Sequence, residues 1–261
     1  MKFKSKMLVV FHNTLNISYY DESIINSYVF INVNPKNDLT KLPTCLKVIN
    51  LYDFNNFISL GKFYAESEVI YNVYRNWESF EDLEYIGFLQ HDIDSSPIDS
   101  SYLDSIKEYD HINFQPYQFD YDYKQNILMD PSQPDKKTGR GKNCYYKIIE
   151  DYNSYYGTNH NIDDLKNKTI NLCSSFLIKA KIFLKMMAFI SFIIEKGELY
   201  MYDSKRENRI QGGLLERYFA VWLAFENLNV VEFGLEHHFA ESDIRKTILE
   251  RITNKVFKLF R

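Results

Sequence analysis

The sequence predicts a single α/β domain that ends in an amphipathic helix. Apolar runs of strand length, such as 85–89, alternate along the chain with longer segments of helical spacing, such as 63–77. This alternation is typical of a sheet covered by helices. The chain has 261 residues, of which 45% are hydrophobic and 25% are charged. These values match those of one large globular domain.

Charge and composition exclude several classes of protein. The net charge of -4 argues against nonspecific nucleic-acid binding, which depends on neutralising phosphates. The longest apolar run, 183–194, contains Lys185 and falls short of the roughly 18 residues that span a bilayer. The first six residues carry three lysines and no secretory pattern. Three widely spaced cysteines form no metal-binding pair: Cys45, Cys144 and Cys173. We therefore expect a cytoplasmic protein.

The first half of the chain reads as strands joined by polar connections. Apolar or β-branched runs predict five strands: 6–12, 28–33, 46–51, 85–89 and 111–115. Segment 63–77 has helical spacing with neither glycine nor proline, and it predicts the helix that crosses back to strand 85–89. A second helix is expected to start at Asp99 or Ser100 and to end at Tyr109.

The segment 117–143 breaks this regular pattern. It combines aspartates and prolines with the basic run Lys136–Lys142, so the sequence predicts a long irregular loop. Loops of this length in a compact domain are often functional. Two interpretations remain open here: a solvated flexible loop, or a basic flap that closes over an anionic nucleotide.

The second half alternates again. The patterns predict helices at 145–155, 162–165, 180–195 and 214–225, and strands at 169–178 and 230–233. Segment 244–261 has an apolar residue every fourth position and a basic opposite face. It could be a terminal helix docked on the domain. It could also be an interfacial helix attracted to anionic lipid, which would place the protein peripherally at a membrane.

The most informative stretch follows the buried strand 85–89. His91, Asp92 and Asp94 come directly after this strand, where ligands bind in open α/β sheets. In an extended chain, Asp92 and Asp94 share one side, and two carboxylates are suitable ligands for Mg²⁺ or Mn²⁺. The alternative is that these residues only lead into the helix that begins near Pro97.

Several blocks together resemble a known family. They are Tyr64-Ala65 with Tyr74-Arg75-Asn76, Tyr85-Ile86-Gly87, Cys173 to Ile178, and Leu215 to Leu223. In order and spacing the chain resembles bacterial and large-virus glycosyltransferases of the GT-A fold, above all capsular and surface-polysaccharide transferases of the DUF4422 type. One block departs from that pattern, because His91-Asp92-Ile93-Asp94 stands where the DUF4422 type usually has His-Tyr-Arg-Arg.

The resemblance implies a GT-A-like, Rossmann-like mixed sheet flanked by helices. It places a nucleotide-diphosphate sugar donor in residues 1–116 and a glycan or lipid-linked acceptor in 144–243. The segment 117–143 lies between these halves, 1–243 form the domain, and 244–261 form the terminal helix. A divalent cation, Mn²⁺ or Mg²⁺, would lie between the Asp-x-Asp motif and the diphosphate.

The same resemblance suggests roles for individual residues. Asp92 and Asp94 would bind metal, with Asp92 also reaching the donor and Asp94 the stronger metal ligand. His237 or His238 would complete the site, since imidazole is a suitable ligand for Mn²⁺.

Donor and catalytic residues follow from position. Phe11, His12 and Asn13 end the first strand and Asp53 follows the third, so topology predicts that they contact the nucleoside. An inverting transferase needs a carboxylate base. Glu216, which follows Gly212-Gly213 near an expected helix start, is the first candidate, and Asp203 is the second. Glu216 could instead pair with a neighbouring arginine.

Two other functions remain open at this point. A metal-dependent phosphoesterase could use His91, Asp92 and Asp94 with the His237-His238 pair, although two-metal hydrolases need more ligands than these. A non-catalytic carbohydrate-binding protein on the same fold would bind sugar without depending on metal or on Asp94.

Overall fold

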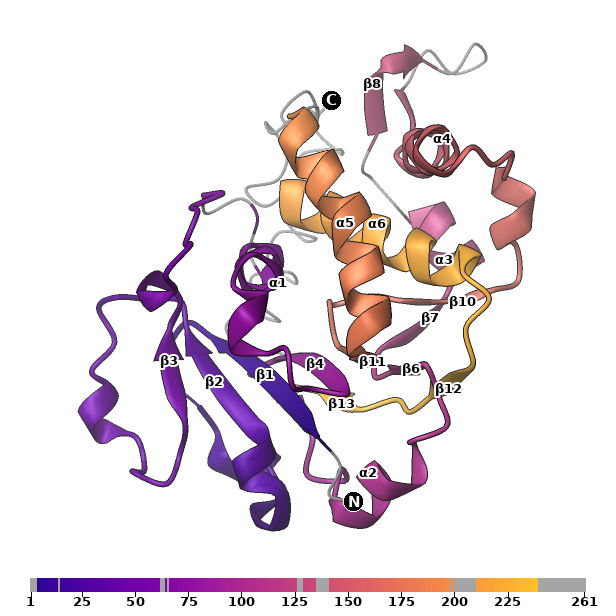
Figure 1. Ribbon diagram of the computed structural model, residues 1–261. Helices are drawn as coiled ribbons and strands as arrows, with labels where there is room; N and C mark the ends of the chain where they lie inside the picture. The colour runs from indigo at the N-terminus through magenta and orange to yellow at the C-terminus, as the bar shows by residue number, and fades with distance from the viewer. Residues whose placement is uncertain are drawn as a thin grey trace, which may run out of the picture.

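The computed structural model describes residues 4–13, 15–61, 64, 66–125, 129–134, 141–197, 199 and 210–238. Its centre is a seven-stranded sheet in the order β12-β6-β11-β4-β1-β2-β3 (Figure 1). Strands β1 (Ser5–Phe11), β2 (Tyr28–Asn32), β3 (Val48–Asn50) and β4 (Tyr85–Gln90) are parallel. The α/β class and the mixed sheet predicted from the sequence are confirmed.

Strand β11 (Phe176–Lys179) gives the sheet its mixed character. It runs antiparallel to both β4 and β6 (His111–Asn113), and β12 (Val230–Glu232) is parallel to β6. The residues that lead into β11 therefore lie at the same edge as the carboxyl ends of β1 and β4. Polar groups from three separate parts of the chain meet at this edge.

Gly87 allows β4 to fit between its neighbours. A Cβ at this position would lie 2.4 Å from Met7 Sδ and 3.1 Å from both Leu177 Cδ1 and the Phe176 carbonyl oxygen. The glycine within the apolar run is therefore required by close packing of the central strands.

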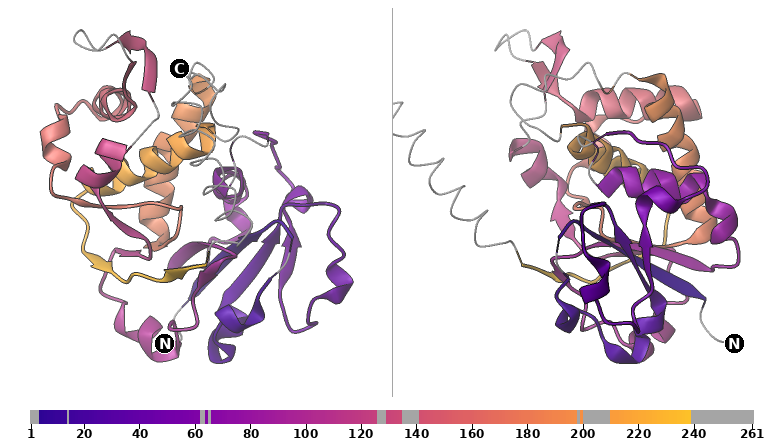
Figure 2. Two further views of the ribbon diagram at one scale, coloured as in Figure 1. Left: turned by 180° about the vertical axis from the view of Figure 1, so that it is seen from behind. Right: turned by 90° about the vertical axis from the view of Figure 1, so that its left-hand side faces the viewer.

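Helices cover both faces of the sheet. One face carries α1 (Glu66–Arg75), α4 (Tyr145–Tyr156), α5 (Ala180–Lys196) and α6 (Ile210–Phe225) (Figure 2). The other face is covered by α2 (Ser100–Ser105) and by the short 3-10 helices Ile17–Tyr19 and Glu22–Ser27. Among the described residues no helix is long and apolar enough to cross a bilayer.

Alternation along β1 explains why there are two cores. Leu8 and Val10 pack under α1 and α5, whereas Met7 and Val9 pack on the opposite face. Successive side chains of a strand point to opposite faces, so a continuous apolar run produces a strand buried on both sides.

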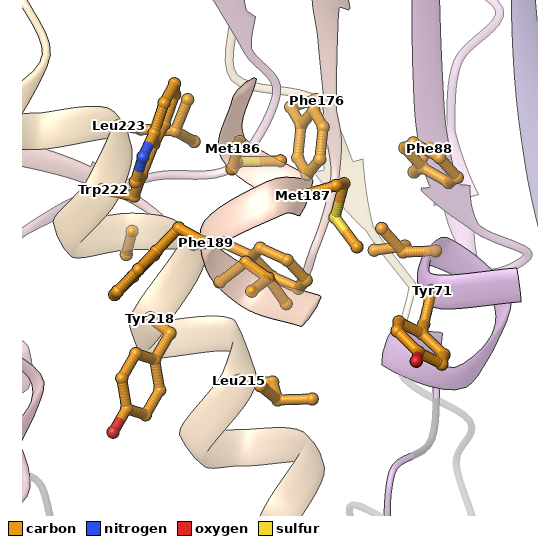
Figure 3. Packing of buried hydrophobic residues seen from close by; sticks show 14 of the residues in the cluster. Tyr71, Phe88, Phe176, Met186, Met187, Phe189, Leu215, Tyr218, Trp222 and Leu223 are labelled. Carbon is orange, nitrogen blue, oxygen red and sulfur yellow. The ribbon is translucent and has the colours of Figure 1, made fainter. Parts of the chain in front are cut away.

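Helices α5 and α6 pack together over β4 and β11. Figure 3 shows Phe189 of α5 beside Tyr218 and Trp222 of α6. Trp222 is fully buried, and its indole N–H donates to the Tyr156 hydroxyl at 2.9 Å. Because Leu215 faces this core, the next residue, Glu216, points to the flank of α6.

The interpretation of 117–143 as irregular is wrong for its described part. This part contains β7 (Pro116–Gln118), α3 (Phe119–Gln125), β8 (Met129–Pro134) and β9 (Gly141–Asn143). Tertiary contacts stabilise α3, because Phe119 is fully buried and Asp122 is largely buried. The first part of the basic run, 136–140, lies outside the described residues.

The prediction of a single strand over 169–178 is also wrong. The chain forms β10 (Thr169–Asn171), which pairs with β7 in a separate two-stranded sheet, and then β11 in the main sheet. Cys173 and Ser174 separate the two strands, with φ of 59° and 46°. Residues in this left-handed region cannot continue a strand.

Two helix boundaries differ from the prediction. Helix α2 ends at Ser105 instead of Tyr109, because the Tyr85 hydroxyl donates to the carbonyls of Lys107 and Tyr109 and holds this segment in a turn. Helix α6 begins at Ile210, which is buried, so Gly212 and Gly213 lie inside the helix. Within the described residues, the other predicted strands and helices are confirmed to within a few residues, with 162–165 as a 3-10 helix.

Candidate active site

Two histidines mark the carboxyl edge of the central strands. His12 follows β1 and His91 follows β4, and their ring centroids are 6.4 Å apart. His12 Nε2 also lies 3.7 Å from a carboxylate oxygen of Glu66, the first residue of α1. Burial lowers the pKa of His91 below its ordinary value, so its imidazole favours the neutral form, which can act as a metal ligand or hydrogen-bond partner.

Asp92 is held from the far end of the described chain. Strand β13 (Glu236–His237) pairs antiparallel with β5 (Ile93–Asp94). This pairing brings His237 Nε2 to 3.1 Å from Asp92 Oδ2, and the His238 N–H donates to the Asp92 carbonyl at 2.8 Å. Burial acts to raise the pKa of Asp92, but the hydrogen bond and charge of His237, together with the charge of His91 and a backbone hydrogen bond, lower this pKa overall.

The polar atoms around Asp92 are compatible with a cation. Asp92 Oδ1 and His238 Nε2 are both buried, and neither has a hydrogen-bond partner within the described residues. Buried polar atoms of this kind usually have a partner, and a carboxylate with an imidazole is a suitable ligand pair for Mn²⁺. Among all the described residues, no group of three or more Asp, Glu, His or Cys side chains is arranged so that it could hold a metal ion. Further ligands would therefore have to come from substrate or water.

Asp94 lies in a different environment. Its Oδ1 accepts the N–H of Ser96 at 2.9 Å. Burial raises the pKa of Tyr28 to about 12, and the nearby Asp21 and Asp94 carboxylates contribute to this rise. Asp94 therefore contacts the Ser96 backbone, whereas Asp92 is the carboxylate that His237 contacts. The ranking of Asp94 as the stronger metal ligand stays a prediction, and the geometry favours Asp92.

Glu216 reaches the same edge from α6. Its side chain is 22% exposed, and one of its carboxylate oxygens accepts the backbone N–H of Cys173. Burial raises the pKa of Glu216, and this rise is partly offset by the Arg217 charge and by the Cys173 hydrogen bond. A carboxylate with a raised pKa is a better proton acceptor near neutral pH. The predicted residue is therefore at the site, although it lies within a helix and not near its start.

The turn at Cys173 and Ser174 joins the two halves of the site. Two consecutive residues other than glycine with positive φ are uncommon, and strain of this kind is concentrated at functional sites. The turn is held by Ser175, whose hydroxyl donates to the Cys173 carbonyl at 2.9 Å, and by Asn171, whose amide donates to the Ser175 carbonyl at 2.7 Å.

Cys173 itself remains a thiol. Burial raises its pKa to about 12, and the charges of Glu216, Asp92 and Glu66 contribute to this rise. A thiol that does not ionise near neutral pH is a poor nucleophile. Of these three carboxylates, Glu216 contacts the turn directly, since it accepts the Cys173 N–H.

Arg217 lies next to Glu216 and is bound elsewhere. Its Nε and Nη2 donate to the two carboxylate oxygens of Asp122 at 3.1 and 2.9 Å. The Tyr145 hydroxyl donates to Asp122 Oδ2 at 2.7 Å. This buried network connects α3, α4 and α6 directly beside the candidate base.

A network of amide side chains extends over the ends of β1, β2 and β3. The Asn37 side chain donates to the His12 carbonyl at 2.9 Å and to Asn32 at 2.8 Å. Asn32 in turn donates to Asn50, and Asn50 donates to Asp53, at 3.0 and 2.9 Å. The network links the predicted nucleoside residues His12 and Asp53 along one edge.

Phe11 differs from its predicted role. Its side chain is 1% exposed and lies in the core on the face of the sheet that α2 covers. Its carbonyl accepts the N–H of Val33. In this segment, only the exposed residues His12 and Asn13 therefore remain candidates for contact with a nucleoside. Two further predictions, Asp203 as reserve base and 244–261 as a terminal helix, lie outside the described residues.

Four residues of the site were not among the predicted ones: Glu66, Asp122, Cys173 and Arg217. Of these, Cys173 and Arg217 had a signal in the sequence, because both lie in blocks that carry the family resemblance and Arg217 adjoins Glu216. The others reach the site through tertiary folding, which leaves no local pattern in the sequence.

Comparison of the fold with solved structures identifies its type. The apo structure of WbbM, a bifunctional glycosyltransferase, matches 91% of this chain with a TM-score of 0.59 and 12% sequence identity. This chain has the GT-A fold. It spans 45% of WbbM, so it corresponds to less than half of that protein. No protein-family model matches the chain, nor does any curated protein sequence.

Other glycosyltransferases of this fold match less closely. Glucosyl-3-phosphoglycerate synthase from Mycobacterium tuberculosis, in complex with Mn²⁺, UDP and glucosyl-3-phosphoglycerate, has a TM-score of 0.41 and 10% identity over 93% of this chain and 75% of its own. The mannosyltransferase Ktr4p from S. cerevisiae, in complex with GDP, has a TM-score of 0.40 and 13% identity over 91% of this chain and 71% of its own.

Proposed function

We propose that the protein is a metal-dependent glycosyltransferase that moves a sugar from a nucleotide-diphosphate donor to a hydroxyl acceptor. One observation carries this proposal: Asp92, paired with His237, follows β4, and Glu216 accepts the Cys173 N–H just before β11, the strand that pairs with β4. A metal-binding carboxylate beside a proton acceptor is the pair of groups that an inverting transfer from a diphosphate requires.

The metal site is proposed at Asp92. Its unpartnered Oδ1, with His237 and His238 beside it, would hold Mn²⁺ or Mg²⁺ together with the donor diphosphate. When bound, such an ion stabilises negative charge on the departing nucleotide. Asp94 would support the loop, since its carboxylate accepts the Ser96 N–H.

Glu216 is proposed as the base. The acceptor oxygen attacks the anomeric carbon, the bond from that carbon to the diphosphate breaks, and the acceptor proton passes to Glu216. The burial that raises the pKa of Glu216 favours this proton transfer. The 22% exposure of the side chain leaves room for an acceptor to reach it.

The donor nucleoside is proposed to lie along the amide network, next to His12, Asn13 and Asp53. The acceptor is proposed to be a glycan or a lipid-linked sugar of surface-polysaccharide or glycoprotein-glycan synthesis, acting on the cytoplasmic side. This acceptor class rests on the sequence resemblance to capsular transferases. A peripheral membrane contact through 244–261 rests on the apolar and basic pattern of that segment.

The test is turnover of a panel of UDP-, GDP- and dTDP-sugars with Mn²⁺ or Mg²⁺. Release of nucleoside diphosphate is measured with and without simple sugar acceptors, in wild type and in Glu216→Gln. Metal-dependent release that the variant loses is expected. Release of inorganic phosphate from a simple ester would contradict the proposal and support a phosphoesterase. Sugar binding that ignores both metal and Asp92→Ala, without turnover, would support a binding protein.

A further inference from the structure

Arg217 has two carboxylates within reach and is bound to only one of them. Its guanidinium fork faces Asp122, with donor distances of 3.1 and 2.9 Å. Its remaining nitrogen, Nη1, donates to the Gly213 carbonyl at 2.8 Å and lies 3.7 Å from Glu216 Oε2. The shorter contacts with Asp122 form the bidentate geometry that guanidinium–carboxylate pairs prefer.

Glu216 and Asp122 compete for this guanidinium. Both carboxylates are largely shielded from water, and Arg217 is 15% exposed, so neither pair is strongly screened by solvent. Asp122 comes from α3 and is fixed by the Tyr145 hydroxyl at 2.7 Å. Without a carboxylate at position 122, the fork would be free to turn towards Glu216.

We infer that Asp122 is a positioning residue, which holds the Arg217 fork and so keeps Glu216 available as a proton acceptor. The inference builds on the proposed role of Glu216. It assigns a function to α3, whose sequence predicted only an irregular loop, and it explains why a buried ion pair lies directly beside the candidate base.

The groups that face Glu216 define the expected direction of change. They are Glu66 of α1, the Cys173 N–H and thiol, Tyr117 of β7, Asp122 of α3, and Arg217 of α6 itself. Arg217 lowers the pKa of Glu216, whereas the charges of Glu66 and Asp122 raise it. Removing the Asp122 charge should therefore lower this pKa, both directly and by freeing Arg217.

The experiment is a pH titration of the side-chain carboxyl carbons in ¹³C-glutamate-labelled protein, without metal or substrate. Glu216→Gln assigns the Glu216 resonance. In Asp122→Asn we expect the Glu216 midpoint to fall by about one pH unit, the low end for a new contact with an opposite charge. In Tyr145→Phe, which removes a hydrogen bond to Asp122 and no charge, the midpoint should stay near its wild-type value.

A second variant protects the test against poor folding of Asp122→Asn. Arg217→Met removes the cation, so the Glu216 midpoint should move in the opposite direction, to higher pH. An unchanged midpoint in both charge variants would overturn the inference, as would an equal downward shift in Tyr145→Phe.

This titration is independent of turnover, so it separates the inference from the proposed function. If the shifts occur but Glu216→Gln retains full activity, the proposed base is wrong and the contact between Asp122 and Arg217 still controls Glu216. If Glu216→Gln is inactive and the midpoint does not move, the base stands and the role of Asp122 is wrong. With an active donor, the acidic limb of kcat/KM should shift in the same directions.

Discussion

His237 Nε2 lies 3.1 Å from Asp92 Oδ2, although the two residues come from opposite halves of the chain. The pairing of β13 with β5 makes this contact, and the stacking of His238 on Tyr19 at 4.9 Å reinforces it. The end of the described chain therefore forms one wall of the candidate metal site. Neither half contains the whole site, so no local motif connects Asp92 with His237, and only the family resemblance suggested that the late histidines belong to it.

Replacement of the two motif aspartates should have unequal effects. In Asp92→Ala, Mn²⁺ binding in the presence of a nucleoside diphosphate should be lost, because the variant removes the carboxylate beside His237. Asp94→Ala should retain most of it, since the Asp94 carboxylate accepts the Ser96 N–H, whereas the carboxylate that His237 contacts is that of Asp92. Free Mn²⁺ is quantified by electron paramagnetic resonance. Equal loss in both variants would show that Asp94 is also a ligand.

Glu216→Gln should lower kcat by about 10²–10⁴-fold, the usual contribution of a general base. Nucleotide affinity should change little, because the substitution keeps the size of the side chain. Steady-state kinetics and calorimetric titration of the nucleotide measure the two effects. A kcat within a few-fold of wild type would remove Glu216 from the mechanism.

His111 should make the protein sensitive to acid. Burial lowers the pKa of His111 from its ordinary 6.5 to about 3. Between these values the unfolded chain binds a proton that the folded protein does not. Stability is therefore fully present above pH 6.5 and falls as the pH drops, by up to about 1.4 kcal/mol per pH unit.

The variant His111→Phe tests this source of acid sensitivity. Phenylalanine keeps a ring next to Phe176, which lies 6.1 Å from the His111 ring, and it cannot bind a proton. Urea unfolding of both proteins between pH 4 and 8 should show a shallower loss of stability in the variant. Parallel curves for the two proteins would mean that other groups cause the acid sensitivity.

Gly87→Ala should destabilise the fold by about 1–3 kcal/mol, the range for overpacking a core. The added methyl group would lie 2.4 Å from Met7 Sδ and 3.1 Å from the Phe176 carbonyl, which cannot move easily within the sheet. Gly234→Ala is the matched control, because its Cβ would meet only Pro116 at 3.8 Å. Chemical denaturation measures both, and equal stability of the two variants would contradict the packing argument.

The parts of the fold that sequence could predict are those with local signals. The apolar run 85–89 identified β4 because burial on both faces requires consecutive apolar residues. The break between β10 and β11 was missed because Cys173 and Ser174 take positive φ without glycine or asparagine. Helix α3 was missed because the buried Phe119 and the pairing of Asp122 with Arg217 stabilise it.

For the candidate site, too, only the residues with a local signal could be predicted from the sequence. Asp92 was predicted because it follows a buried strand, and the structure places it at the edge where that rule expects ligands. Glu216 was predicted because it was expected to lie near a helix start, but the structure begins α6 at Ile210. The reason for selecting Glu216 was therefore wrong, although the residue lies at the candidate site. Its environment depends on the Cys173 turn and on Arg217, and tertiary contacts of this kind have no periodicity in the sequence.

The most direct test of the central claim is thermal unfolding of the wild-type protein with a panel of nucleoside diphosphates, each with and without Mn²⁺. A ligand at 100 times its Kd stabilises the native state by about 2.7 kcal/mol, which gives a visible rise in Tm. We predict that one nucleotide raises Tm only when Mn²⁺ is present, and that Asp92→Ala abolishes this rise. No rise with any nucleotide, or an equal rise in Asp92→Ala, would contradict the assignment of this site to a metal-dependent glycosyltransferase.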